Sequence, residues 1–124
     1  MTSETPLESA ALKDLVVDAL DDIKAVEVVV LDVEGQTDIA DYMVVASGTT
    51  SRQVKALTDS VVVKAKASGN KVLGVEGTET AEWVLIDLGD VLCHIMLPRV
   101  REFYDLERLW SLTPRQNDDA LAED

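Results

Sequence analysis

Cysteine and histidine are almost absent from this chain of 124 residues, in which Cys93 and His94 are the only examples. A single cysteine excludes an intramolecular disulfide, and it disfavours a metal site built on thiolates. A metal centre also needs several ligands at suitable spacing, which one histidine does not provide. We therefore expect neither a metal site nor any other cofactor.

Long apolar stretches and targeting signals are missing as well. No apolar run reaches the roughly 20 residues that cross a membrane. Residues 1–6 contain neither a basic region followed by an apolar core nor the Arg-rich composition of a transit peptide. We therefore expect a cytoplasmic protein without a membrane partner. Its length suits one domain, residues 1–112, and the acidic tail at 113–124 is predicted to be disordered.

Positive charge is scarce, because 11 Lys and Arg residues stand against 24 Asp and Glu residues and leave a net charge of −13. A chain this acidic is repelled by phosphate groups, so we expect little or no direct contact with nucleic acid. It can still dock on a basic protein, since opposite potentials speed encounter and exclude wrong partners. The competing interpretation, which net charge alone favours, is that the charge only keeps the protein soluble.

Apolar residues recur at helical spacing in several parts of the chain. Residues 5–8 (Thr-Pro-Leu-Glu) have the form of a capping box with proline in the first turn, and they predict a helix that follows. Residues 50–53 (Thr-Ser-Arg-Gln) offer a second capping box, for a helix that ends near Gly69. Pro98 opens a last helical stretch, which we predict to reach Trp110.

Runs of β-branched and alternating apolar residues predict strands between these helices. The run at 27–32 (Glu-Val-Val-Val-Leu-Asp) is apolar and mostly β-branched between its acidic ends, and it predicts a buried strand. Gly89-Asp90 has the Gly-X form of a two-residue hairpin turn. The order of elements predicts an α/β protein of the α+β type, a mixed sheet of about five strands with flanking helices. The predicted strands are 27–32, 41–47, 71–75, 82–88 and 91–97.

Aspartates near the predicted strand ends raise the possibility of an enzyme. They could hold a divalent cation for nucleotidyl transfer, although turn and cap chemistry is the commoner role at such positions. Nucleotidyltransferases usually carry Gly-Ser after a first strand and then Asp-x-Asp. Here Gly48 is followed by Thr49, and no Asp-x-Asp occurs. We therefore expect no catalytic residues and no enzyme. The aspartates concerned are Asp32, Asp38, Asp41, Asp87 and Asp90.

The predicted strands at 82–88 and 91–97 carry the most informative pattern. Alternation places Trp83, Leu85 and Asp87 on one face of the first strand, and Leu92, His94 and Met96 on one face of the second. The opposite faces, which include Cys93, are apolar and predict core. The mixed face has the composition of a protein-binding patch. Alternation alone does not distinguish a protein-binding patch from a face that a helix covers, in which case Trp83 would belong to the core.

Several ordered blocks of the sequence resemble one known family. The most distinctive block is 81–91 (Ala-Glu-Trp-Val-Leu-Ile-Asp-Leu-Gly-Asp-Val). Together the blocks span about residues 8 to 111 at consistent spacing, and they resemble the ribosomal silencing factor S family, also called Iojap-like proteins. Two departures are mild: Glu82 stands where the family often has Asp, and Cys93 where it usually has an aliphatic residue. The other blocks are 31–35, 41–54, 74–77, 93–96 and 101–110.

The resemblance implies a nucleotidyltransferase-like fold that lacks the catalytic residues. It implies binding to ribosomal protein number fourteen of the large subunit, which lies where the subunits meet. Occupying that face blocks joining of the small subunit and represses translation, notably under nutrient limitation. The family's partner surface implies a role for Trp83 and, around it, for Leu85, Asp87, His94 and Met96. Homodimers occur in the family, so a homodimeric scaffold remains an alternative, as does a metal-dependent nucleotidyltransferase-like enzyme.

Overall fold

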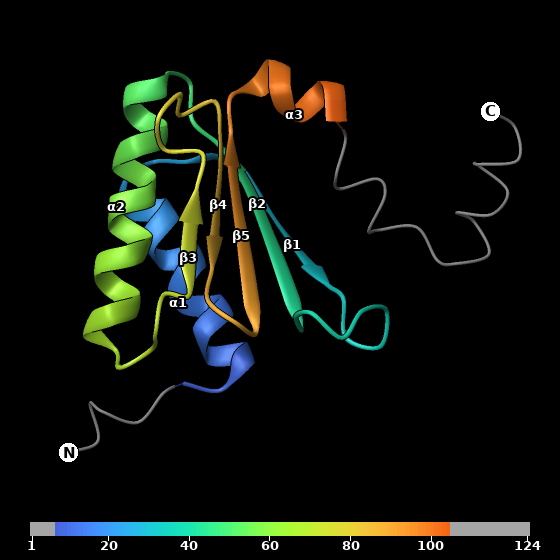
Figure 1. The fold of residues 1–124 in the computed structure, drawn as a ribbon. Coiled ribbons are helices and arrows are strands. Elements are labelled where there is room, and N and C mark those ends of the chain that lie inside the picture. The colour runs from blue at the N-terminus through green and yellow to red at the C-terminus, as the bar shows by residue number, and fades with distance from the viewer. Residues whose placement is uncertain (1–6, 105–124) are drawn as a thin grey trace, which may run out of the picture.

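Five strands form one mixed sheet in the order β1-β2-β5-β4-β3 in the computed structural model, which describes residues 7–104 (Figure 1). β2 and β5 are parallel, and the other neighbours are antiparallel. The predicted mixed sheet with flanking helices is confirmed, whereas the nucleotidyltransferase-like detail stays a prediction. The elements are α1 (Ser9–Asp22), β1 (Val26–Asp32), β2 (Tyr42–Ser47), α2 (Ser51–Ala67), β3 (Gly74–Glu76), β4 (Trp83–Asp87), β5 (Val91–Met96) and α3 (Pro98–Tyr104).

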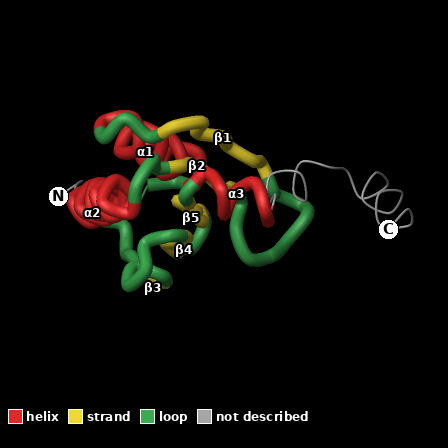
Figure 2. The backbone as a smooth tube through the Cα atoms, turned by 90° about the horizontal axis from the view of Figure 1, so that it is seen from above, coloured by secondary structure: helices red, strands yellow, loops and turns green. Residues whose placement is uncertain are grey.

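Both long helices cover the same face of the sheet, where α1 and α2 lie side by side (Figures 1 and 2). Their buried side chains, such as Leu12 and Leu57, meet Ile86 and Ile95 from the sheet in the main core. Within residues 7–104, the opposite face carries a single helix, α3, which lies at one end of the sheet (Figure 1). No helix in this part of the chain is long and apolar enough to cross a membrane.

The first turn of α2 joins the two helices. The Thr50 hydroxyl accepts a hydrogen bond from the Gln53 N–H at 3.1 Å, as the predicted capping box requires. The Gln53 side chain reaches back to the N–H of Thr49 at 2.7 Å rather than to that of Thr50. Its amide group also donates to the backbone carbonyls of Ile23 and Lys24, each at 3.1 Å. The side chain therefore fixes the end of α1 against the start of α2.

The predicted start of the first helix is wrong. The helix begins at Ser9 with Glu8 at its N-cap, and the Glu8 side chain makes no capping hydrogen bond. The Leu7 N–H donates instead to the Asn70 side chain, 3.2 Å away, which ties this residue to the loop after α2. Thr5 and Pro6 lie outside the described residues. So do the predicted helix end at Trp110 and the tail at 113–124.

The prediction that the first strand is buried is also wrong. β1 lies at an edge of the sheet, and Leu31 is its only buried residue. The side chains of Val26 and Val30 are 38% and 39% exposed. A bulge between Val26 and Val29, where Glu27 has a φ of 50°, interrupts the pairing with β2. The apolar run therefore predicts a strand correctly, but it does not indicate whether that strand lies inside the sheet or at its edge.

A tight turn after β3 sets the start of β4. Gly77 has a φ of +90°, and its carbonyl accepts a hydrogen bond from the N–H of Ala81 at 3.0 Å. A Cβ atom at Gly77 would lie 2.1 Å from the carbonyl oxygen of Trp83. The turn therefore requires glycine both for its conformation and for the close approach of the two backbones.

We expect Gly77→Ala to lower the free energy of unfolding by on the order of 3 kcal/mol, because it combines a positive φ with a clash against rigid backbone. Urea unfolding would measure this change. Gly74→Ala, in the strand just before this turn, is the matched control, since nothing lies within 4 Å of a Cβ there and that substitution should be nearly neutral. Equal unfolding midpoints for the two variants would contradict this account of the turn.

Candidate partner-binding face

The face of the sheet that points away from α1 and α2 gathers all the predicted site residues, and we name it the open face. Cross-strand register pairs Trp83 with Met96, Leu85 with His94, and Asp87 with Leu92. Residues paired in this way point to the same side of the sheet. β2 continues the face on the other side of β5, and β1 completes it. The open face consists of Val29, Leu31, Met43, Val45, Ser47, Trp83, Leu85, Asp87, Leu92, His94 and Met96.

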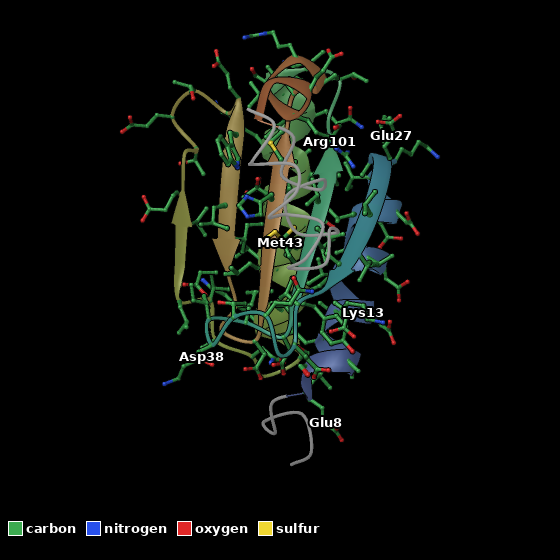
Figure 3. The ribbon with its side chains drawn as sticks, turned by 90° about the vertical axis from the view of Figure 1, so that its right-hand side faces the viewer. Glu8, Lys13, Glu27, Asp38, Met43 and Arg101 are labelled. Carbon is green, nitrogen blue, oxygen red and sulfur yellow. The ribbon has the colours of Figure 1, made fainter. Side chains whose placement is uncertain are left out.

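Exposure varies across the open face from β2 to β4. The centre is buried: Met43 is 4% exposed and His94 9%, and the side chains of Val45 and Met96 are inaccessible. Figure 3 views this face and shows Met43 near its middle. The β4 residues Trp83, Leu85 and Asp87 are partly exposed. The predicted residues therefore share one face but differ in exposure, because His94 and Met96 are buried and the three β4 residues are partly exposed.

Trp83 is neither a free surface residue nor part of the main core. Its indole N–H donates a hydrogen bond to Nδ1 of His94 at 2.9 Å, and the two ring centroids lie 5.9 Å apart. It also packs at the border of a second apolar cluster, which contains Met96 and Val100. Within residues 7–104, α3 lies at one end of this face (Figure 1). Both interpretations of Trp83, an anchor for a partner and a core residue, therefore stay predictions.

Burial changes the protonation of the neighbouring residues His94 and Cys93. It lowers the pKa of His94 to about 4, so the ring is neutral at pH 7 and its Nδ1 is free to accept from the indole. On the opposite face, burial raises the pKa of the Cys93 thiol to about 12. Cys93 is inaccessible, which confirms the prediction of a core residue. Neither residue has the titration behaviour of a base or nucleophile that works near neutral pH.

Two of the five aspartates singled out in the sequence, Asp32 and Asp87, hold turns. The Asp32 carboxylate accepts a hydrogen bond from the Glu34 N–H at 3.0 Å, and the Asp87 carboxylate accepts from the Gly89 N–H at 2.9 Å. This is the turn chemistry that the alternative to a cation site predicts. No group of three or more possible metal ligands occurs within residues 7–104. Asp87 thus combines a structural contact with a place at the edge of the open face.

α3 borders one end of the open face through a residue that the sequence reasoning did not single out. The Arg101 side chain is 6% exposed, and its guanidinium donates to the Ser47 hydroxyl at 3.0 Å. Arg99 forms an ion pair with Glu82, the residue before β4, at 3.3 Å. Arg101 opens the matching block at 101–110, which was the only signal of its importance. Together these contacts hold α3 against the end of the sheet where Trp83 lies.

The loop at residues 33–41 borders the other end. Val33 is inaccessible and belongs to the same apolar cluster as Met43 and Met96. Figure 3 shows Asp38 of this loop and Arg101 of α3 at opposite ends of the open face. Exposed carboxylates at Glu34 and Asp38 line the loop, and Glu76 lies opposite Leu85 on the neighbouring strand. The open face therefore has a buried, mostly apolar centre, a partly exposed row on β4 and an acidic border.

Comparisons with known proteins agree with this arrangement. The family described as "Ribosomal silencing factor during starvation" matches residues 6–124. Ribosomal silencing factor RsfS of Chromobacterium violaceum is 47% identical to the chain over 104 residues, which cover 84% of the chain and 85% of the relative. A crystal structure of a protein from the same species superposes with a TM-score of 0.84 at 46% identity, covering 87% of this chain and 91% of that one.

A more distant relative comes from a eukaryotic organelle. Mouse "Mitochondrial assembly of ribosomal large subunit protein 1" is 34% identical over 113 residues, which cover 89% of the chain and 49% of the mouse protein. The fold and the sequence together define an α+β domain of a ribosome-related class. The chain belongs to the ribosomal silencing factor family, as the resemblance of its sequence blocks predicted.

The burial of His94 predicts a pH dependence of stability. Its pKa is about 6.5 in the unfolded chain and about 4 in the folded protein, so its contribution is complete above pH 6.5 and is lost as pH falls toward 4. At pH 5 we expect a loss of roughly 2 kcal/mol relative to pH 7 from this residue alone. Urea unfolding of the wild type and of His94→Asn at both values isolates the contribution. An equal loss in the two proteins would assign the dependence to carboxylates instead.

Proposed function

We propose that this protein represses translation by binding the large ribosomal subunit through its open face and sterically blocking the small subunit. The observation that carries the proposal is the partly exposed row Trp83, Leu85 and Asp87 beside the buried centre of the open face. An aromatic side chain beside apolar and polar neighbours is the usual composition of an anchoring site at a protein interface. Membership of the silencing-factor family supports the ribosome as the partner.

The partner we propose is ribosomal protein number fourteen of the large subunit, which the family resemblance implies. Its position where the subunits meet accounts for repression without chemistry, since a bound domain occupies volume that the small subunit needs. The acidic border of the open face, with Glu34, Asp38 and Glu76, suits a basic ribosomal protein. The mouse relative is named for assembly of the large subunit, which supports the choice of subunit.

The proposed contact residues have different tasks. Trp83 is the anchor, Leu85 extends the apolar contact, and Asp87 supplies charge at the edge while it holds the turn at Gly89. His94 and Met96 support Trp83 from below, since their own side chains are buried. We propose a regulatory, non-catalytic role in the cytoplasm. A neutral, buried histidine and turn-forming aspartates offer no general base or metal ligand set in the described region.

We expect Trp83→Ala to weaken binding to isolated large subunits roughly thirtyfold, which corresponds to on the order of 2 kcal/mol. Repression in a subunit-joining assay should weaken with it. Because Trp83 is partly buried, we also expect its removal to cost roughly 1–2 kcal/mol of stability, too little to unfold the protein. Sedimentation with purified subunits and a melting curve measure the two effects.

Val63→Ala is the matched control for this substitution. Val63 is 64% exposed on α2, on the other side of the sheet, so its truncation should change neither binding nor joining. Normal sedimentation and normal inhibition by a folded Trp83→Ala variant would remove Trp83 from the binding site. The open face as the contact surface would then be rejected with it.

The acidic border predicts that binding weakens as salt concentration rises. The slope should be modest, because a contact between two proteins releases fewer ions than a track of phosphates. We expect Glu76→Gln to reduce the slope, whereas Asp59→Asn, an exposed change on α2, should leave it unaltered. Binding titrations at several salt concentrations would show this. A steep slope that persists without the ribosomal protein but disappears without the RNA would contradict the proposed partner.

A further inference from the structure

The pair formed by Trp83 and His94 links the surface of the open face to its buried layer. Trp83 lies on β4, and its indole N–H points at Nδ1 of His94 on β5, 2.9 Å away. In the register of the two strands His94 faces Leu85, so the hydrogen bond runs diagonally across the sheet. A diagonal neighbour lies within reach of a long aromatic side chain, whose rotamer the contact then selects.

His94 is well placed to hold this hydrogen bond and poorly placed to touch a partner. Its side chain is 9% exposed and lies between Val45 on β2 and Leu85 on β4. Both neighbours are apolar and fix the ring without competing for the indole N–H. A tryptophan that is ordered before binding loses less rotamer entropy when it enters a partner's pocket.

We propose that His94 is a positioning residue, which holds the Trp83 indole through Nδ1 in the orientation that meets the ribosomal partner. The inference rests on the proposed function and changes the role that sequence reasoning assigned to His94. The imidazole acts on binding through Trp83, and the partner does not contact it. Binding should therefore weaken when the hydrogen-bond acceptor at position 94 is lost, and it should persist when only the imidazole ring is lost.

Asparagine and leucine at position 94 separate these two effects. The Asn side chain places an oxygen close to where Nδ1 of histidine lies, and Leu has the same branching without an acceptor. We expect His94→Asn to bind large subunits within about threefold of the wild type. We expect His94→Leu to bind roughly three- to tenfold more weakly, the range that one neutral hydrogen bond supplies. In a Trp83→Phe background, which has no indole N–H, the two variants should bind equally.

The indole proton resonance of Trp83 in the free protein provides a readout that does not depend on the ribosome. The chain contains two tryptophans, so a ¹⁵N-correlated spectrum shows two indole resonances, and the Trp83→Phe variant assigns the one that belongs to Trp83. The Trp83 indole resonance should move, and its proton should exchange faster with solvent, in His94→Leu. Both properties should stay near the wild-type values in His94→Asn.

Each result has a definite consequence. Weaker binding by His94→Leu alone, together with its altered indole resonance, supports the positioning role. The positioning role is overturned if the wild type binds and the two variants, His94→Asn and His94→Leu, bind equally well. This holds whether both variants bind weakly or both bind as tightly as the wild type. A wild-type protein that fails to bind large subunits rejects the proposed function itself. The indole spectra still report in that case whether His94 orders Trp83.

Discussion

β2 and β5 run parallel through the middle of the sheet, and nearly every residue in both strands is buried. A parallel pair of this kind presents apolar side chains on both faces, so both faces need cover. α1 and α2 supply it on one side. On the other side Val100 of α3 and Val33 of the loop at 33–41 pack with the buried centre, and the β4 row stays partly exposed. The burial of this central pair thus creates the open face.

Much of this arrangement follows from local sequence signals. The alternation in 82–88 and 91–97 placed Trp83, Leu85, Asp87, His94 and Met96 on one face, because side chains in a strand alternate strictly. The turn at Gly89 was equally predictable, and its φ of +88° is the conformation that glycine favours. Signals of this kind depend on residues that are close together in the sequence, so they can be recognised from the sequence alone.

Depth and position in the sheet were not predictable in the same way. The run at 27–32 has the composition of an inner strand, yet it lies at an edge, because strand order is decided by contacts between distant segments. Met96 is buried in a cluster with Val33 and Val45, which come from other segments of the chain, and nothing in its own strand indicates this. The contact of Arg101 was not predictable for a related reason, since its hydrogen-bond partner Ser47 is 54 positions away in the chain.

The Gln53 side chain, finally, makes the helical layer a cooperative unit. It binds the carbonyls at the end of α1 while its own backbone completes the cap of α2. The Ser60 hydroxyl adds a second tie to α1, through the carbonyl of Ala19 at 2.9 Å. Fraying of α1 at its C-terminal end therefore breaks bonds that also hold the first turn of α2. Amide hydrogens in the two helices should accordingly exchange with solvent through shared opening events, as a single foldon does.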